Sequence, residues 1–517
     1  MAQGSGSSSH ALQNRATTLP TDIDLETLGR QRPTTFPTLY SEIGFCVSLF
    51  GSMVMAEYFI SGFNLVLPQI SASLNITPES RTWPASAFTL VTGAFLLPSA
   101  RLADIYGAYT VFNLGLGWFS VWSLVAGFSQ NYLMLIFCRA LQGLGASAFL
   151  PSGIMLLGSI YRPGPRKNIV FSLYGALAPV GFFMGIFVGG LTANFLSWKW
   201  YFWLGGILCF VFSATSLLAI PRDGTETRDS GMKMDWLGTL TIVPGLLLIV
   251  YAITDCSHAG RASPQIYVAF ALGVVCLGIA AYVEGWVAKN PLLPFVIFRS
   301  QSMKPLVVSL FFTYGVFGLY LFYASFYIEI VLNIDPLQTA VWFAPMAVGG
   351  LILATVSGVL LHRLPGRALL VLSGLGNLAC TMLFALMPKQ PDYWAFILPA
   401  MIGATVGVDI TYVVSNVFIT THMPRHQQGV AGALINSLVF LGTSFFLGIA
   451  DLVSANTAHL GLRASYKAAF WLGAGCAGIA LACVIFTKIG SAKSELTDEE
   501  RAELEMAEQS CTPSWVA

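Results

Sequence analysis

Long apolar stretches alternate with short polar segments along almost the whole chain. A membrane-spanning helix needs about 20 mostly apolar residues, and fourteen stretches approach this length. They lie approximately at 43–68, 84–100, 109–129, 132–158, 169–193, 200–220, 237–254, 265–288, 305–330, 338–361, 367–387, 393–419, 428–450 and 466–488. Most gaps between them are too short to hold a folded domain outside the membrane. We therefore predict an all-α protein with fourteen membrane spans, whose function lies within the membrane.

The composition agrees with this pattern. Charged residues make up 10% of the 517 residues and hydrophobic residues 55%, whereas a soluble protein carries about 25% charged residues. The net charge of +1 offers no basic surface for binding nucleic acid. No two of the nine cysteines have CxxC spacing. Seven of them fall within apolar runs, and we expect these to be small buried apolar side chains and not metal ligands: Cys46, Cys138, Cys209, Cys276, Cys380, Cys476 and Cys483.

The two ends of the chain are polar. Residues 1–40 are rich in Ser, Thr and Pro and are predicted to be a disordered tail. Residues 491–517 form an acidic tail, in which Thr497 and Glu500 are spaced as a helix-capping box. Nineteen Lys and Arg fall on the side of the N-terminus and six on the other side. Because such residues mark the cytoplasmic side, we expect both termini in the cytoplasm. The plasma membrane is the expected location, with the vacuolar membrane as the alternative.

Two motifs resemble those of the major facilitator superfamily. The segment ARLADIYGAY (100–109) is similar to that family's loop signature G-x-L-x-D-R-x-G-R-R, with Leu102, Asp104 and Gly107 in register. The signature's first glycine and its three arginines are replaced here. The segment RALQGLGA (139–146) matches the family pattern R-x-x-Q-G-x-G-A without a departure. The resemblance implies that Asp104, together with Arg101, latches the cytoplasmic loop.

The fifth predicted span carries a glycine-rich stretch that is similar to the antiporter motif of the same superfamily. Within residues 175–190, Gly181, Gly185 and Gly189 recur at every fourth position and Pro179 adds a bend. Such a flat face lets a neighbouring helix approach closely. Ordinary helix packing also uses this spacing, so the stretch is weak evidence alone. The resemblance implies that the glycine face holds two helix bundles closed against leak.

Three further motifs narrow the resemblance. They are WKWYFW at 198–203, DWLG at 235–238 and PLLPFVIFR at 291–299. With the other motifs, their order and spacing resemble the fourteen-span drug:proton antiporter family, and the fungal aminotriazole-resistance group most closely. One departure concerns the first span, where Phe59 occupies the position at which this family usually carries an Asp. The nearest acid is Glu57, and two residues rotate a helix by about 200°, so Glu57 does not simply inherit that role.

The resemblance implies two six-helix bundles, at 41–220 and 305–490, joined by a loop and two linker helices at 221–304. The sequence itself supports a repeat, because a polar loop followed by a glycine-rich helix occurs at 162–190 and again at 424–448. Bundles related by an axis along the membrane normal place their binding site at the midplane between them.

Three charged residues lie well inside predicted spans, where each costs roughly 2.5 to 3.5 kcal/mol and so faces a cavity or a partner. Helical spacing puts each of them on a polar stripe. The stripes are Glu57, Ser61 and Asn64 in span 1; Arg139 and Gln142 in span 4; and Thr405, Asp409, Tyr412 and Asn416 in span 12. The resemblance implies that these spans line the central cavity. We therefore predict a substrate and proton pathway, in which Arg139 and Gln142 bind substrate or tune the acids. The alternative is that Glu57 or Asp409 only neutralises Arg139.

Span 9 contributes three tyrosines at helical spacing, Tyr320, Tyr323 and Tyr327, within an aromatic run. An aromatic face with hydroxyl groups suits flat, partly apolar molecules or organic cations. A packing face or an interfacial face is the equally open alternative.

These observations predict a secondary active transporter that exports a small organic compound in exchange for protons. Phosphate-binding loops and enzyme signatures such as HExxH are absent from the sequence. We expect a monomer in the lipid bilayer that is not an enzyme and uses no cofactor or metal. Two alternatives remain open. One is a proton-coupled importer or facilitator of a nutrient or of a small inorganic species such as borate, and the other is a transporter-like sensor.

Overall fold

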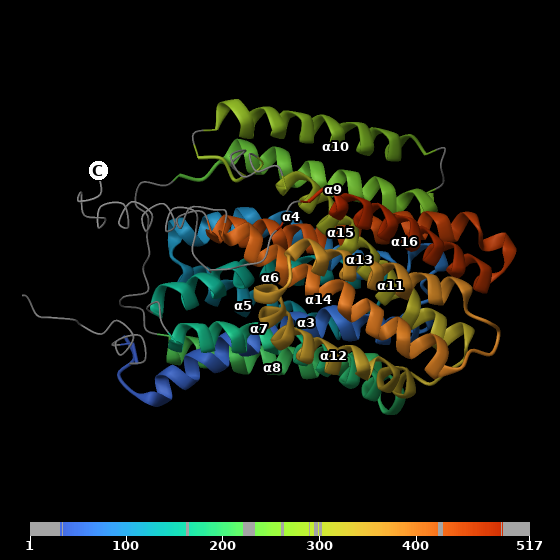
Figure 1. Ribbon diagram of the computed structural model, residues 1–517, viewed down its shortest axis with the longest axis horizontal. Helices are drawn as coiled ribbons and strands as arrows, with labels where there is room; N and C mark the ends of the chain where they lie inside the picture. The colour runs from blue at the N-terminus through green and yellow to red at the C-terminus, as the bar shows by residue number, and fades with distance from the viewer. Residues whose placement is uncertain are drawn as a thin grey trace, which may run out of the picture.

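The computed structural model describes residues 32–489 apart from 34, 162–164, 221–232, 260–262, 289, 294–297, 299–301, 422–427 and 488. These residues form helices and no strand (Figure 1). The helices are α3 (Leu39–Ser73), η1 (Pro78–Ser80), α4 (Trp83–Tyr106), α5 (Ala108–Ala126), α6 (Tyr132–Ile160), α7 (Pro165–Phe195), α8 (Trp198–Ala219), α9 (Trp236–Ala259), α10 (Pro264–Tyr282), η2 (Val283–Val287), α11 (Met303–Phe326), η4 (Tyr327–Val331), α12 (Pro336–Arg363), α13 (Gly366–Leu386), η5 (Tyr393–Ile397), α14 (Leu398–Thr421), α15 (Gln428–Asn456), η7 (Ala458–Leu460) and α16 (Leu462–Ile485). The predicted capping box at Thr497 lies outside the described residues.

The prediction of fourteen membrane spans is confirmed, because fourteen helices in the described part are long and apolar enough to cross a bilayer. The chain is a multi-pass membrane protein. The helix ends differ from the prediction most clearly at α3, which was expected at 43–68. The helix starts at Leu39 because the Thr38 side chain accepts a hydrogen bond from the Ser41 backbone N–H at 3.2 Å. It also continues through Pro68 to Ser73.

Contacts between helices follow a pattern that occurs twice. Among the first six spans, α3 packs against α7 and α8, α6 against α4 and α5, and α5 against α8. Among the last six, α11 packs against α15 and α16, α14 against α12 and α13, and α13 against α16. We call these groups the N-terminal bundle (α3–α8) and the C-terminal bundle (α11–α16). The bundles meet mainly where α4 contacts α15 and where α7 contacts α12.

The remaining two spans form a hairpin outside the bundles. Helices α9 and α10 pack against each other, and α9 also contacts α15 and α4 (Figure 1). Side-chain contacts hold α9 to both bundles. The Ser257 hydroxyl donates to Asp451 Oδ2 on α15 at 2.5 Å, and the Tyr251 ring lies 5.7 Å from the Trp83 ring on α4. The hairpin therefore covers one of the two places at which the bundles meet.

The glycine face of α7 packs closely against a helix backbone, and its partner is α3 of the same bundle. A Cβ atom added to Gly181 would lie 2.5 Å from Val54 O, and one added to Gly185 would lie 2.5 Å from Ser61 Oγ. The role predicted for this face, holding the two bundles closed against leak, stays a prediction, and the helix that the face contacts belongs to the N-terminal bundle. Gly190 contacts the other bundle instead, since a Cβ atom there would lie 2.8 Å from Ala340 Cβ.

The buried apolar side chains show on which side the bundles join. We call the side on which α3 begins and α16 ends the terminal side. One cluster runs from the N-terminal bundle into the C-terminal bundle through residues such as Phe326, Phe343 and Phe384, which lie away from the terminal side. A separate cluster, including Met303 and Leu369, fills the terminal half of the C-terminal bundle. Among the described residues, most of the apolar core that joins the bundles therefore lies away from the terminal side, with Ala433 near the start of α15 as an exception.

Candidate functional site

A cavity of about 190 Å³ lies between the two bundles. Helices α3, α4, α6 and α7 form one wall, and α11, α12, α14 and α15 form the other. Most lining side chains are apolar or aromatic, including Met53, Phe182, Phe317, Met346 and Phe440. Such a surface suits a partly apolar small molecule, whose orientation is fixed by a few polar groups.

Two carboxylates face this cavity from opposite bundles. Glu57 reaches it from α3 and Asp409 from α14, and the two lie close enough for their charges to interact. Both side chains are partly exposed to the cavity. In the described part of the chain, neither acid forms an ion pair. Two acids in a largely apolar cavity are unfavourable when both are ionised. The arrangement therefore favours binding of a proton or of a cation.

Arg139 is held by groups other than these acids. Its guanidinium donates to Pro84 O at 3.3 Å and to Gln142 Oε1 at 2.7 Å. The same group lies 4.1 Å from the centre of the Phe63 ring and 4.4 Å from that of Phe88. No described carboxylate pairs with it. The alternative that Glu57 or Asp409 neutralises Arg139 therefore has no support in this geometry, because aromatic faces and neutral acceptors surround the cation.

The predicted site residues divide into those that line the cavity and those that lie beside it. Asn64, Thr405 and Tyr412 line the cavity together with Glu57, Arg139 and Asp409. Ser61 instead lies at the α3–α7 contact and donates to Phe182 O at 2.7 Å. Gln142 donates to Ser123 Oγ at 2.6 Å inside the N-terminal bundle. Asn416 donates to Tyr412 O at 3.2 Å, one turn beyond the lining residues.

The three tyrosines predicted in span 9, Tyr320 and Tyr323 of α11 and Tyr327 of η4, lie in the interior of the C-terminal bundle. The rings of Tyr320 and Tyr327 lie 5.3 and 6.1 Å from the Phe384 ring, and the Tyr323 ring lies 6.4 Å from that of Phe470. None of the three lines the cavity. The structure thus places them in a packing face, which the sequence had left as the alternative.

Other residues of α11 and α15 form the cavity wall. Tyr314, Phe317 and Leu321 line it from α11, and Asn436 and Thr443 line it from α15. The Tyr314 hydroxyl is buried and has no hydrogen-bond partner in the described part of the chain. Tyr314, Phe317 and Leu321 are three and four residues apart, which is the spacing of residues on one face of a helix. The neighbouring tyrosines have the same spacing, so the sequence does not indicate which face points to the cavity.

The position of Phe59 explains the departure from the family pattern in span 1. Phe59 is fully buried in the N-terminal bundle, with its ring 5.4 Å from that of Phe119 and 5.7 Å from that of Tyr201. Beside it, Tyr58 and Tyr201 each donate a hydroxyl hydrogen bond to the other's backbone carbonyl, at 2.8 and 2.6 Å. This aromatic cluster leaves no room for a solvated acid, whereas Glu57 points to the cavity.

The loop motif of α4 lies at the terminal side. Arg101 Nη2 donates to the carbonyls of Asn290 and Pro291 at 3.2 and 3.1 Å, which connects α4 to the segment after the hairpin. Asp104 lies in the last turn of α4. Gly107, between α4 and α5, has a φ of 92°, a conformation that favours glycine.

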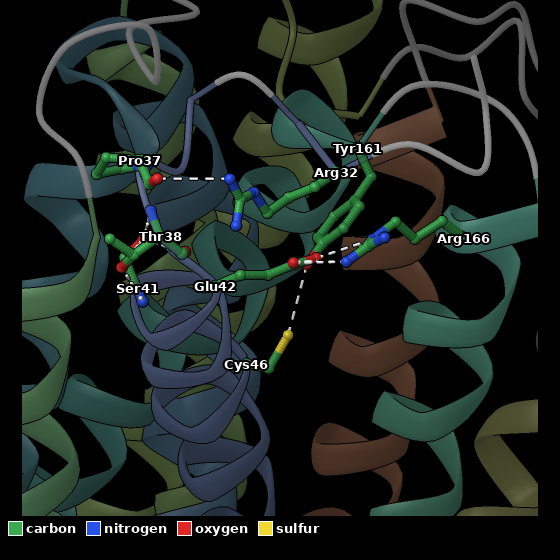
Figure 2. A network of polar contacts seen from close by, with 8 residues as sticks. All are labelled: Arg32, Pro37, Thr38, Ser41, Glu42, Cys46, Tyr161 and Arg166. Atoms are coloured by element: carbon green, nitrogen blue, oxygen red, sulfur yellow. Dashed lines mark hydrogen bonds and ion pairs between the residues drawn. The ribbon is translucent and has the colours of Figure 1, made fainter. Parts of the chain in front are cut away.

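A second polar cluster lies at the terminal end of the N-terminal bundle (Figure 2). Glu42, at the start of α3, accepts hydrogen bonds from Arg166 Nε at 2.9 Å and Nη2 at 2.6 Å, and from the Tyr161 hydroxyl at 2.9 Å. The hydrogen-bonded carboxylate raises the pKa of Arg166. Cys46 Sγ lies 3.5 Å from the Tyr161 hydroxyl. This cluster ties α3 to the junction of α6 and α7.

Comparison with known proteins identifies the chain's relatives. The profile of the Major Facilitator Superfamily matches residues 48–447. The low affinity ammonium transporter of Saccharomyces cerevisiae is 33% identical over 410 residues, which cover 77% of this chain and 79% of that protein. Efflux pump terJ of Aspergillus terreus is 30% identical, with coverage of 89% and 90%. The aminotriazole resistance protein of Saccharomyces cerevisiae is 30% identical, with coverage of 88% and 85%.

Solved structures share the fold at low sequence identity. The nucleoside transporter NupG has a TM-score of 0.60 at 12% identity, and the match covers 87% of this chain and 99% of that one. At this identity the likeness concerns the fold alone. Together with the sequence relatives, it confirms the resemblance that the loop and helix motifs indicated.

Proposed function

The chain belongs to the major facilitator superfamily of membrane transporters, and within it we propose that this protein is a proton-coupled exporter of small organic compounds. The observation that carries the proposal is the pair Glu57 and Asp409, which face one cavity from different bundles without ion-pair partners in the described residues. The names of terJ and the aminotriazole resistance protein, an efflux pump and a resistance protein, are consistent with export. No enzymatic activity is proposed.

The transport cycle follows from how each protonation state fits the cavity. A proton from outside binds to Glu57 or Asp409 when the cavity is open outward, and the substrate leaves. Protonation removes a charge from the largely apolar cavity, which favours rocking of the bundles toward the cytoplasm. The proton then leaves to the cytoplasm and the ionised site binds the next substrate. Asn64, Thr405 and Tyr412 offer it hydrogen bonds from the walls.

With both termini in the cytoplasm, as the distribution of Lys and Arg favours, the terminal side is the cytoplasmic side. The apolar core is continuous between the bundles on the opposite side. We therefore assign the structure to the inward-facing half of the cycle, in the plasma membrane. In the other half of the cycle, the contacts between α4 and α15 and between α7 and α12 rearrange.

The gating residues receive roles that fit their positions. We assign Arg101 and Asp104 to a latch at the terminal side, where Arg101 binds the segment after the hairpin. The glycine face of α7 keeps α3 and α7 moving as one unit, and Pro179 contacts Gly350 of the opposite bundle. Arg139 packs over the Phe63 ring at the cavity wall and over the buried Phe88 ring, and it contributes positive potential to the cavity.

The deciding experiment is a toxicity panel in a yeast strain that lacks its own exporters. The panel contains azoles, dyes, organic cations, fungal metabolites and borate, and it compares the wild type with Glu57→Gln and Asp409→Asn at matched expression. We expect the wild type to raise tolerance to some compounds and at least one variant to lose this tolerance. Asp409→Glu, which keeps the charge, is the matched control. Full tolerance in both neutral variants would refute proton coupling through these acids.

A second candidate is import of a small nitrogen compound, which the relative named as an ammonium transporter favours. In a strain without ammonium transporters, expression of the chain would then restore growth on low ammonium. If cells that express the wild-type chain became more sensitive to compounds of the toxicity panel, this result would also favour import. A sensor role is weakened if deletion of residues 491–517 leaves the phenotype intact.

A further inference from the structure

Two carboxylates meet where the α9–α10 hairpin begins and ends, far along the chain from the cavity residues. Asp235 directly precedes α9, and Glu284 lies in the π-turn η2 at the end of α10. Asp235 begins the motif DWLG, and Glu284 lies before the motif PLLP. The transport proposal gives neither acid a role. Glu284 is 7% exposed, and it is therefore nine-tenths buried.

Each carboxylate uses one oxygen to organise the local backbone. Asp235 Oδ1 accepts the Gly238 N–H at 2.9 Å, which caps the first turn of α9. Glu284 Oε2 accepts the Leu293 N–H at 3.1 Å, which holds the segment after the hairpin. These bonds fix both side chains, so the position of the second oxygen of each is also fixed.

The second oxygens point into one shared space. Asp235 Oδ2 and Glu284 Oε1 are both buried, and neither has a partner in the described part of the chain. A Cβ atom added to Gly238 would lie 2.5 Å from Asp235 Oδ2 and would also collide with Glu284 Oε1. The absence of a side chain at Gly238 therefore leaves a space that both oxygens face.

Two ionised carboxylates with bare oxygens in a buried space repel each other strongly. Arg101 of α4 acts on Glu284 electrostatically, but its Nη2 is bonded to the Asn290 and Pro291 carbonyls. Asp235 acts on Glu284 with the opposite sign. Buried oxygens are normally hydrogen-bonded, and one proton shared by the two would provide this bond.

We propose that Asp235 and Glu284 bind a single proton between Oδ2 and Oε1, forming a protonation site at the terminal side that is separate from the central cavity. While the proton is bound, the hairpin ends stay together and the carbonyls that accept from Arg101 stay in place. Loss of the proton places two negative charges together, which separates the hairpin ends and loosens their connection to α4. This proposal does not depend on whether Glu57 and Asp409 carry the transported protons.

Infrared difference spectroscopy of the full-length protein in lipid nanodiscs tests this site, because a protonated carboxyl has its own C=O stretching band. A Glu57→Gln/Asp409→Asn background removes the cavity acids. We expect a pH-dependent band that disappears in Asp235→Asn and also in Glu284→Gln, because each amide can donate to the remaining carboxylate and keep it ionised. Asp255→Asn, at the other end of α9, is the control and leaves the band intact.

Retention of the band in either amide variant would overturn the sharing of one proton. A measurement on the unmodified protein keeps the proposal testable if the variants do not fold. The Leu293 amide should exchange slowly with deuterium while the pair is protonated and much faster at higher pH, after correction for the intrinsic exchange rate. Corrected exchange that is independent of pH would equally overturn the proposal.

Discussion

Helix α3 carries two acids in opposite situations. Glu42, at its terminal end, accepts three hydrogen bonds from Arg166 and Tyr161 (Figure 2). Glu57, near the middle of the same helix, faces the central cavity and has no ion pair in the described residues. The buried Glu42 carboxylate is compensated by these hydrogen bonds, whereas Glu57 is partly exposed to the cavity.

The difference indicates what each acid can do. A carboxylate that accepts a bidentate pair of hydrogen bonds from an arginine contributes to stability, whereas an acid that faces a cavity without such a partner is available to bind a proton or a substrate. We therefore assign Glu42 to fixing the N-terminal bundle and Glu57 to the transport cycle. Position within a span is not sufficient to separate these roles, because both residues belong to one apolar helix.

The largest expected effect is on transport. Glu57→Gln should abolish transport driven by a pH gradient, because the amide cannot take up a proton. Exchange of labelled for unlabelled substrate, which needs no net proton movement, should persist in proteoliposomes. The midpoint of thermal unfolding should stay the same or rise, because a charge leaves an apolar cavity. If Glu57→Gln transported its substrate along a pH gradient at the wild-type rate, the assignment of Glu57, and not Glu42, to the transport cycle would be wrong.

The contact between α3 and α7 next to Glu57 should be sensitive to a single methyl group. Gly185→Ala would bring a Cβ atom to 2.5 Å from Ser61 Oγ, and such overpacking costs about 1–3 kcal/mol. Thermal unfolding in detergent measures the loss. Gly175→Ala on the same helix is the matched control, since no atom lies within 4 Å of its added Cβ. Equal stability of the two variants would contradict the close contact.

Breaking the Glu42 cluster should reduce stability and leave transport intact. Arg166→Ala removes two hydrogen bonds to a buried carboxylate, and a loss of about 2 kcal/mol is expected. Because Glu42 raises the pKa of Arg166, the pair's stabilisation does not decline as the pH rises through the neutral range. The difference in unfolding midpoint between variant and wild type should therefore be constant there. Lys167→Ala, one residue further, should have little effect, and transport lost in Arg166→Ala would contradict a purely stabilising role.

The smallest expected effect concerns the cavity wall. Tyr314→Phe removes a buried hydroxyl that has no partner in the described residues, so the unfolding free energy should change by less than about 1 kcal/mol. If substrate binds this hydroxyl, its apparent affinity should fall a few-fold in transport assays. Tyr320→Phe, inside the C-terminal bundle, should leave that affinity unchanged.

The fold could be predicted from the sequence because the bilayer imposes a simple rule. Apolar stretches of spanning length define the helices, and the two motifs at 100–109 and 139–146 identify the family. Polar residues inside spans also identified Glu57, Arg139 and Asp409, all of which line the central cavity. A charged side chain in a membrane has few places to lie, which makes this signal strong.

The orientation of uncharged faces could not be predicted in this way. Tyr320, Tyr323 and Tyr327 share one face of α11, but nearly all sides of this helix are buried, so periodicity does not indicate which side meets the cavity. The side chains of Ser61 and Gln142 lie on the predicted stripes, yet neighbouring helices satisfy their hydrogen bonds. Whether an uncharged side chain faces the cavity or a neighbouring helix depends on how the other helices pack around it.

The position of α9 also determines which contact between the bundles faces the lipid. Because α9 lies over the contact between α4 and α15, lipid chains cannot approach the bundles along that line. The opposite line, between α7 and α12, presents exposed apolar side chains such as Val180, Phe187 and Val348. A lipophilic compound dissolved in the bilayer therefore meets the two bundles from one flank only. Fourteen-helix transporters built this way are laterally asymmetric, although their two bundles repeat the same packing.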